Sequence, residues 1–214
     1  MASMTKAANI SDASLMALKR LRRKQSSTEW CELCARALEG RHAHLLDPQA
    51  RRILCACDPC AFLFQDGAGR YRRVPRDSFF LSDLALDNLQ WESLSIPVNL
   101  AFFFFSSPAK RVVAYYPSPG GATESLLTLE AWEGIAAAHP RIRQMQPDVE
   151  ALLVNRVASP PDYYIVPIDR CYELSGIVRK HWQGFTGGDD VWREVANFFA
   201  ALRSEAVTVE EQLA

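Results

Sequence analysis

Five of the chain's six cysteines lie within thirty residues, and their spacing restricts the fold more than any other feature of the sequence. Cys31 and Cys34 form one C-x-x-C knuckle, and Cys57 and Cys60 form a second, with 22 residues between the two. Two such knuckles supply four thiolates in a compact tetrahedron, which is the usual donor set of a structural zinc site. The spacing therefore predicts a zinc ribbon, in which the chain leaves the first knuckle, forms a hairpin and returns to the second.

Four thiolates make a closed metal site. Catalytic zinc keeps one open position and usually has His or carboxylate ligands. A structural Zn²⁺ is therefore expected, contributing about 10–16 kcal/mol of folding free energy by analogy with small zinc modules. A rubredoxin-like iron site uses the same four thiolates, so iron is the alternative metal. Ala35 and Ala61 occupy positions where rubredoxin knuckles normally have Gly, which favours zinc.

Cys55 is not needed for a four-thiolate site. It lies two residues before Cys57, so on a strand both side chains would point to the same side. Three roles remain open for it: a buried thiol near the cluster, an alternative metal ligand, or a redox-active thiol. His42 and His44 lie on the connecting segment and could be outer-shell donors, but we do not place them among the ligands.

The length of 214 residues suits one medium domain with an appended module. No apolar run approaches the roughly 20 residues that span a bilayer, so we expect no membrane span. The N-terminus has a basic, polar segment where a signal peptide would have its apolar region, which predicts a cytoplasmic protein. Thiols stay reduced there, so clustered cysteines favour metal binding over disulfides.

The sequence predicts an α+β fold with an N-terminal helix and a Cys₄ zinc ribbon, followed by a mixed, mainly antiparallel sheet with C-terminal helices. The expected division is a basic helix at 1–27, a zinc ribbon at 28–76, an α+β domain at 77–205 and an acidic, mobile tail at 206–214. Ribbon strands are expected at 44–47, 52–56 and 70–74, with a turn at Pro48 and Gln49.

Four consecutive phenylalanines, Phe102 to Phe105, dominate the strand expected at 96–106. A run without polar alternates predicts a strand that is covered on both faces. The strand is expected to form an antiparallel hairpin with 111–116, and 148–158 is expected to pair similarly with 163–168. Residues 79–91 are expected to be a short helix or an extended linker, and 129–139 a helix.

Two helices are expected to close the chain, capped by Asp169 and Asp189. The apolar face of the first is expected to include Leu174 and Val178. The face of the second is expected at Val191, Val195, Phe198 and Leu202, whose spacing is helical.

The net charge of −1 is unevenly distributed. Residues 1–76 contain 14 Lys and Arg and 7 Asp and Glu, a net charge of +7, whereas the remainder carries −8. A basic module could pack on an acidic one, or a basic surface could face an acidic protein partner or a nucleic acid. Nucleic acid is the weaker alternative, because no aromatic residues for base stacking are interleaved with the basic cluster at 19–24.

Other candidate sites have simpler structural interpretations. The Tyr116–Glu124 loop has a Gly-Gly bend that could cradle an anion, but it lacks P-loop spacing, and a turn is favoured. Cys171 opens a helix, where the dipole lowers a thiol pKa, yet a lone Cys is more often buried. His139 and His181 have no partners arranged as a catalytic triad in the sequence. An enzyme is therefore the less favoured class.

Several segments around the knuckles and beyond them carry distinctive residues. They are Arg41-His-Ala-His-Leu-Leu-Asp47, Leu54-Cys-Ala-Cys-Asp-Pro-Cys60, Tyr116-Pro-Ser-Pro-Gly-Gly-Ala-Thr-Glu-Ser125, 148–154, 171–174 and 182–185. Together with Cys31-Glu-Leu-Cys34 they resemble an uncharacterised bacterial family, domain of unknown function 5947, over nearly the whole chain after residue 28. The family's pattern includes Cys55, and it has no established catalytic residues.

The resemblance implies an accessory role, because genes of this family often lie beside those of [NiFe]-hydrogenases. The favoured function is therefore a zinc-binding accessory protein that docks on a protein partner, plausibly a hydrogenase component. The alternatives are a rubredoxin-like electron-transfer protein, a nucleic-acid-binding ribbon, and an enzyme that uses the Tyr116–Glu124 loop with Cys171 or Cys55.

Overall fold

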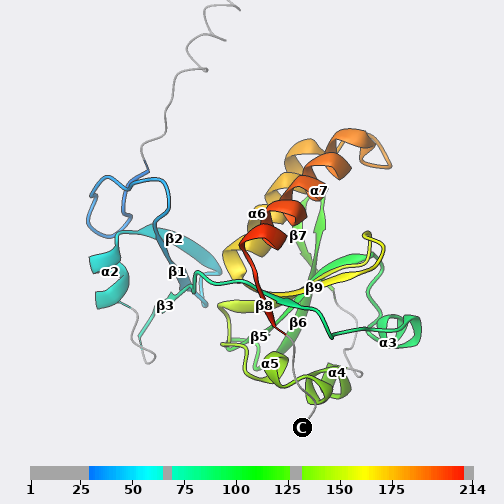
Figure 1. Ribbon diagram of the computed structural model, residues 1–214. Coiled ribbons are helices and arrows are strands. Elements are labelled where there is room, and N and C mark those ends of the chain that lie inside the picture. The colour runs from blue at the N-terminus through cyan, green and yellow to red at the C-terminus, as the bar shows by residue number, and fades with distance from the viewer. Residues whose placement is uncertain (1–28, 65–68, 126–131, 210–214) are drawn as a thin grey trace, which may run out of the picture.

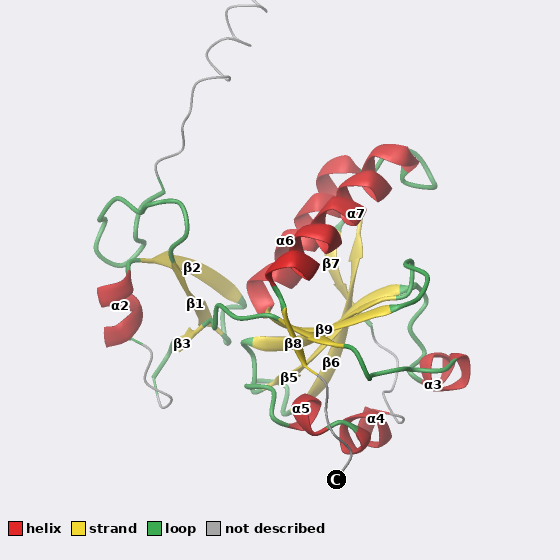
Figure 2. Cartoon of the chain, viewed as in Figure 1, coloured by secondary structure: helices red, strands yellow, loops and turns green. Residues whose placement is uncertain are grey.

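The structure, a computed structural model, describes residues 29–64, 69–125 and 132–209. The basic helix predicted at 1–27 lies outside these residues. The described chain forms two sheets with helices against them, as Figures 1 and 2 show. The mixed α+β class predicted from the sequence is confirmed. No helix within the described residues is long and apolar enough to cross a membrane.

The smaller sheet has the strand order β2-β1-β3, with both pairings antiparallel. The strands are β1 (Ala43–Asp47), β2 (Arg52–Ala56) and β3 (Arg72–Arg73), and helix α2 (Asp58–Leu63) follows β2. Asp47 Oδ1 accepts hydrogen bonds from the backbone N–H groups of Gln49 and Ala50, at 3.1 and 3.0 Å, which closes the turn between β1 and β2. We call this unit, residues 29–76, the ribbon; its hairpin lies where the sequence predicted it.

The larger sheet has the order β10-β4-β9-β8-β5-β6-β7. Its strands are β4 (Phe79–Leu81), β5 (Leu100–Ser106), β6 (Arg111–Ser118), β7 (Gly121–Glu124), β8 (Glu150–Asn155), β9 (Asp162–Pro167) and β10 (Val207–Val209). Among the described strands of this sheet, only β10 and β4 pair in parallel, so the prediction of a mixed, mainly antiparallel sheet is confirmed. The two predicted hairpins correspond to β5–β6 and β8–β9.

Both faces of the larger sheet are covered. The helices are α3 (Asn88–Ser93), α4 (Trp132–Ala138), α5 (Pro140–Arg143), α6 (Ile168–His181) and α7 (Gly188–Glu205). Phe102 and Phe104 pack in a core shared with α6 and α7, whereas Phe103 lies in a second core with Trp91 of α3 and Trp132 of α4. Successive strand residues point to opposite faces, so Phe102 to Phe104 supply both cores as predicted, whereas Phe105 is 41% exposed.

The predicted helix caps were wrong. Pro167 is the N-cap of α6 and Gly187 that of α7, so Asp169 and Asp189 lie inside the first turns. Strand β9 runs directly into α6, which leaves no separate capping residue. Gly187 has a φ of 91°, a conformation that favours glycine. The predicted face of α7 is confirmed, since Val191, Val195, Phe198 and Leu202 are all buried.

Two further segments differ from the expectation. Residues 79–91 contain both a strand, β4, and the start of helix α3. The segment expected to be a mobile tail begins with strand β10, which pairs with β4. Neither strand is evident from local sequence, because each is defined by a partner more than eighty residues away.

Candidate metal centre

The structure brings the four knuckle cysteines together. One thiol sulfur from each of Cys31, Cys34, Cys57 and Cys60 lies within 4.8 Å of the others. The Sγ atoms of Cys34 and Cys57 are 3.7 Å apart, and all six cysteines are free. A disulfide would need about 2.05 Å. Zn–S bonds of about 2.3 Å place the sulfur atoms of a regular tetrahedron about 3.8 Å apart. The four cysteines therefore lie within metal-binding distance, and the donor set fits either zinc or iron.

The first knuckle is a tight turn. The backbone N–H of Ala35 donates to the carbonyl of Cys31 at 2.8 Å, and the N–H of Cys31 donates to the carbonyl of Arg36 at the same distance. Ala35 has a φ of 56°, in the left-handed region that Gly adopts more easily. The conformation expected after a knuckle's second cysteine is thus present here, although Ala occupies the position.

The second knuckle is built differently, because it opens a helix. Cys57 is the N-cap of α2 and Pro59 lies in its first turn, where a missing N–H costs nothing. The N–H of Ala61 donates to the carbonyl of Cys57 at 2.9 Å, so Ala61 is helical, unlike its counterpart Ala35. Helix formation therefore turns the side chain of Cys60 back towards Cys57.

Glu32 ties the two knuckles together. Its backbone N–H donates to the carbonyl of Cys55 at 2.9 Å, and its Oε1 accepts from the N–H of Cys55 at 3.0 Å. Its other carboxylate oxygen forms an ion pair with Arg52. These contacts hold the first knuckle against strand β2, which leads into the second knuckle.

The thiols perturb one another strongly. Burial raises the pKa of Cys31, but hydrogen bonds from the backbone N–H groups of Cys57, Leu33 and Cys34 together lower it by more. The pKa therefore falls to about 6. Burial, together with the three neighbouring thiols, raises the pKa of Cys60 to about 12. The ionisation of Cys31 and that of Cys60 are thus shifted in opposite directions by their surroundings.

Cys55 lies apart from the four-thiol group. Strand β2 ends at Ala56 and the chain turns into α2 at Cys57, so the strand alternation that predicted a common side for Cys55 and Cys57 does not continue. The thiol of Cys55 instead lies within 4.8 Å of ring nitrogens of His42 and His44. Burial is the main cause that raises its pKa, followed by the charges of Glu29, Glu32 and Cys31.

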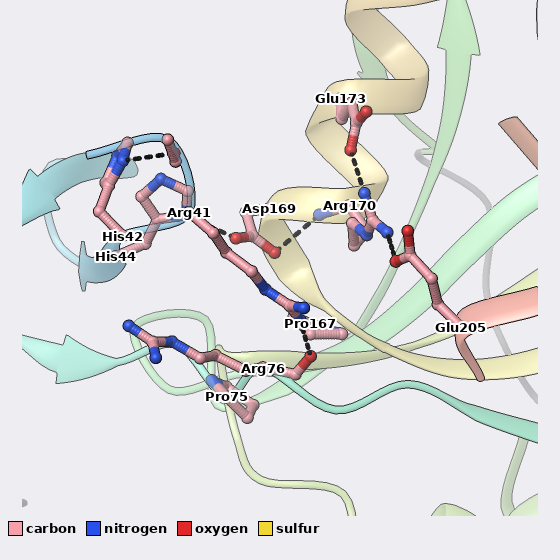
Figure 3. Close-up of a pocket in the computed structure, with 11 residues that line it drawn as sticks. Arg41, His42, His44, Pro75, Arg76, Pro167, Asp169, Arg170, Glu173 and Glu205 are labelled. Carbon is pink, nitrogen blue, oxygen red and sulfur yellow. Dashed lines mark hydrogen bonds and ion pairs between the residues drawn. The ribbon is translucent and has the colours of Figure 1, made fainter. Parts of the chain in front are cut away.

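A cavity of about 520 Å³ lies where the ribbon meets α6, and Figure 3 shows its lining. Nδ1 of His44 lies 2.6 Å from Oδ2 of Asp169, which belongs to the first turn of α6. These two residues are 125 positions apart in the sequence. No local pattern predicts their contact, because it depends on how the ribbon packs on the larger sheet.

The other sequence candidates have structural roles. Tyr116–Glu124 forms the β6–β7 hairpin, with the Ser118 hydroxyl donating to the carbonyl of Gly121 at 3.0 Å, as the favoured turn interpretation predicted. Cys171 is fully buried, and burial raises its pKa well above the ordinary value. Its predicted burial is confirmed. A protonated, inaccessible thiol is a poor nucleophile.

Most arginines of the described ribbon form ion pairs. Among the described residues, ion pairs join Arg52 to Glu32, Arg70 to Asp47, Arg72 to Asp148 and Arg76 to Asp58. The basic cluster at 19–24 lies outside the described residues. With Arg51, which pairs with Glu124, five of the eight arginines in the described part of the ribbon form ion pairs with carboxylates.

Comparison with known proteins gives a family but no characterised relative. No curated protein and no solved structure matches the chain. One family model matches residues 30–206, which include both knuckles, Cys55 and all of the larger sheet except β10. The chain therefore belongs to the family of unknown function DUF5947.

Proposed function

We propose that the four cysteines hold a structural Zn²⁺ and that the protein is a non-enzymatic accessory protein, docking on a protein partner through its ribbon. The observation that carries the proposal is the closed set of four thiols, of which Cys31, Cys57 and Cys60 are buried. Such a set fills a zinc tetrahedron and leaves no position for substrate. The metal would then act by holding the ribbon's shape.

An exposed apolar segment follows the second knuckle directly. Phe62, Leu63 and Phe64 expose 67, 67 and 45% of their surface. Single exposed apolar residues are common, but three in succession at the end of a helix form a local patch. Cys60 lies in the same helix, so metal binding would hold this patch in place. We call these three residues the α2 patch.

The partner that fits the α2 patch is a protein with an apolar groove that accepts aromatic side chains, since buried aromatics are enriched where interfaces bind most tightly. The family resemblance implies a hydrogenase component as the candidate. Thiols that stay reduced fit a cytoplasmic setting. The paired charges of the described ribbon favour a protein partner over a nucleic acid, whose binding needs available Lys and Arg.

A rubredoxin-like iron site is the second candidate, and one observation favours it. Ala35 adopts the positive φ that rubredoxin knuckles use. The second knuckle does not repeat that conformation, because Ala61 is helical. We therefore propose zinc ahead of iron. Metal analysis of protein purified from cells grown with both metals tests this choice: colourless protein containing zinc is expected, and red protein containing iron would overturn it.

The docking proposal is tested by affinity capture with the full chain from a host that expresses a hydrogenase. A Phe62→Asp, Leu63→Asp double variant should reduce capture of a hydrogenase component by about tenfold or more, as expected for residues at the centre of an interface. Leu89→Asp is the matched control, since Leu89 is 77% exposed on α3. Absence of a hydrogenase component from the wild-type capture, or equal capture by the double variant, would contradict the proposal.

A further inference from the structure

A second group of metal-binding side chains lies on the opposite face of the β1–β2 hairpin. His44 and Cys55 are directly paired across the two strands, so their side chains leave the sheet on the same side. Ala43, Leu45 and Ala56 point the other way, into the small core that contains the knuckle cysteines. Strand alternation therefore separates two sets of ligands that are close in sequence.

His42 completes this group. One ligand atom from each of His42, His44 and Cys55 lies within 4.8 Å of the others. The two imidazole rings are 4.9 Å apart between centroids and nearly perpendicular, at 89°. Two imidazoles and one thiol at this separation form a donor set typical of zinc and other late transition metals.

Both imidazole rings form their hydrogen bonds through Nδ1, which leaves Nε2 of each ring available to a metal. Nδ1 of His42 lies 3.2 Å from the carbonyl of Gly40, and Nδ1 of His44 lies 2.6 Å from the Asp169 carboxylate. A carbonyl or carboxylate only accepts, so Nδ1 carries the proton and Nε2 keeps its lone pair. Metal-bound histidines characteristically donate their other N–H to such an oxygen.

The environment of His42 points independently to a ligand. Its side chain is only 9% exposed, and its buried Nε2 has no hydrogen-bond partner among the described residues. A buried polar atom without a partner is costly in a folded protein, and a metal ion bound by this nitrogen would remove the cost. No other side chain of the described ribbon combines these two properties.

Asp169 is placed to orient His44. Its Oδ2 faces Nδ1 of His44, and its Oδ1 accepts from the backbone N–H of Arg170 at 2.8 Å, as Figure 3 shows. The carboxylate is thus held at both oxygens at the start of α6. Because α6 belongs to the larger sheet's helical layer, this ligand set depends on contact between the ribbon and that layer.

We propose that His42, His44 and Cys55 form a second metal site, for Zn²⁺ or a similar late transition metal, with Asp169 as the positioning residue for His44. Three protein ligands leave one tetrahedral position open. His42 and His44 both line the cavity of about 520 Å³, which gives water or a small anion a route to two of the three ligands. This arrangement contrasts with the closed four-thiol site.

Metal stoichiometry of the purified full chain tests the proposal. Wild-type protein reconstituted with Co²⁺ should bind two ions per chain, and His42→Ala and Cys55→Ser should each bind one. His181→Ala, which alters a partly exposed His of α6, is the matched control and should bind two. Circular dichroism checks that each variant is folded. One ion per wild-type chain, or two in folded His42→Ala and Cys55→Ser, would overturn the proposal.

Two further measurements separate this site from the four-thiol site. Asp169→Asn keeps all three ligands but should lower the affinity for the second Co²⁺ by about 10–100-fold, as measured in a competition titration. Added thiocyanate should change the cobalt absorption spectrum of the wild type but not that of His42→Ala, since the four-thiol site has no open position. An unchanged affinity, or an equal spectral change in both proteins, would contradict the assignment. None of these readouts depends on a docking partner.

Discussion

The ribbon and the larger sheet are stabilised by different means. The ribbon's own core consists of Ala43, Leu45, Ala56 and Ala61 with the buried thiols of Cys31, Cys57 and Cys60. The larger sheet separates two cores rich in Phe, Tyr, Trp and branched side chains. Burial energy grows with apolar area, so we expect the sheet to fold on burial alone, whereas the ribbon has little apolar area and under our proposal depends on the metal.

The two regions are also joined. Leu46 of β1 and Val74 are buried in the same core as α6 and α7, and Ile53 packs against it. Arg51 at the ribbon's turn donates to the Tyr115 hydroxyl at 3.1 Å, and that hydroxyl donates to Glu124 at 2.8 Å. We therefore expect the ribbon and the larger sheet to have separate free energies of unfolding, coupled through these contacts. The domain boundary expected at residue 76 stays a prediction.

Metal removal should have the largest effect. Stripping the protein with a strong chelator should destabilise the ribbon by about 10 kcal/mol or more, because its thiolates would lose their shared cation. Hydrogen exchange followed by mass spectrometry should show lost protection in β1 and β2 and retained protection in β8 and β9.

Cys60→Ser should reproduce this pattern without a chelator, and restored Zn²⁺ should recover protection in the wild type only. Uniform loss of protection across both sheets would show that the two regions do not differ as proposed. Unchanged protection in the ribbon would show that it folds without metal.

A large-to-small substitution in the core of the larger sheet should destabilise the sheet and leave metal binding by the ribbon unchanged. Phe102 is fully buried between Tyr115 and α6, so Phe102→Ala should cost about 3–5 kcal/mol of unfolding free energy. Urea denaturation measures the loss. The metal content should not change while the variant remains folded, and a parallel loss of metal would show that the two regions are not stabilised independently.

The interface between the regions predicts a smaller, pH-dependent effect. Burial and the hydrogen bond to Glu124 raise the pKa of Tyr115 to about 12. The raised pKa means that the hydroxyl stabilises the fold fully below about pH 10, and that this contribution is lost as pH rises towards 12. Tyr115→Phe should therefore cost about 1 kcal/mol at pH 8 and progressively less above pH 10.

Denaturation of Tyr115→Phe and wild type across this pH range supplies the measurement. Tyr116→Phe is the control, because Tyr116 lies next to it on β6 but outside the Arg51–Glu124 contact. A difference between Tyr115→Phe and wild type that is constant with pH would contradict the role of the hydroxyl.

The smallest effects are expected from substitutions at the equivalent alanine of each knuckle. Ala35→Gly should stabilise the metal-loaded protein by about 1 kcal/mol, because Ala35 has a φ of 56°. Ala61→Gly changes the equivalent position of the helical knuckle and should destabilise it by about 1 kcal/mol. Thermal unfolding of the loaded proteins measures both, and changes of the same sign would contradict the assigned difference between the knuckles.

Much of the fold was predictable because the relevant signals are local. The ribbon hairpin, the β5–β6 and β8–β9 hairpins and the buried face of α7 follow from turn residues and apolar periodicity. The caps of α6 and α7 were mispredicted, because Asp is a common cap and the strand entry into α6 is not visible locally. Strands β4 and β10 were missed because each depends on a distant partner.

The sequence by itself determined the four-thiol group, since knuckle spacing brings Cys31, Cys34, Cys57 and Cys60 within reach whatever surrounds them. Only the tertiary structure decided the place of Cys55. Because β2 ends at Ala56, Cys57 no longer shares a side with Cys55, and the β1–β2 register sets Cys55 beside His44. Packing of the ribbon on α6 then brings Asp169 to His44, a contact that spans 125 positions and that no local spacing encodes.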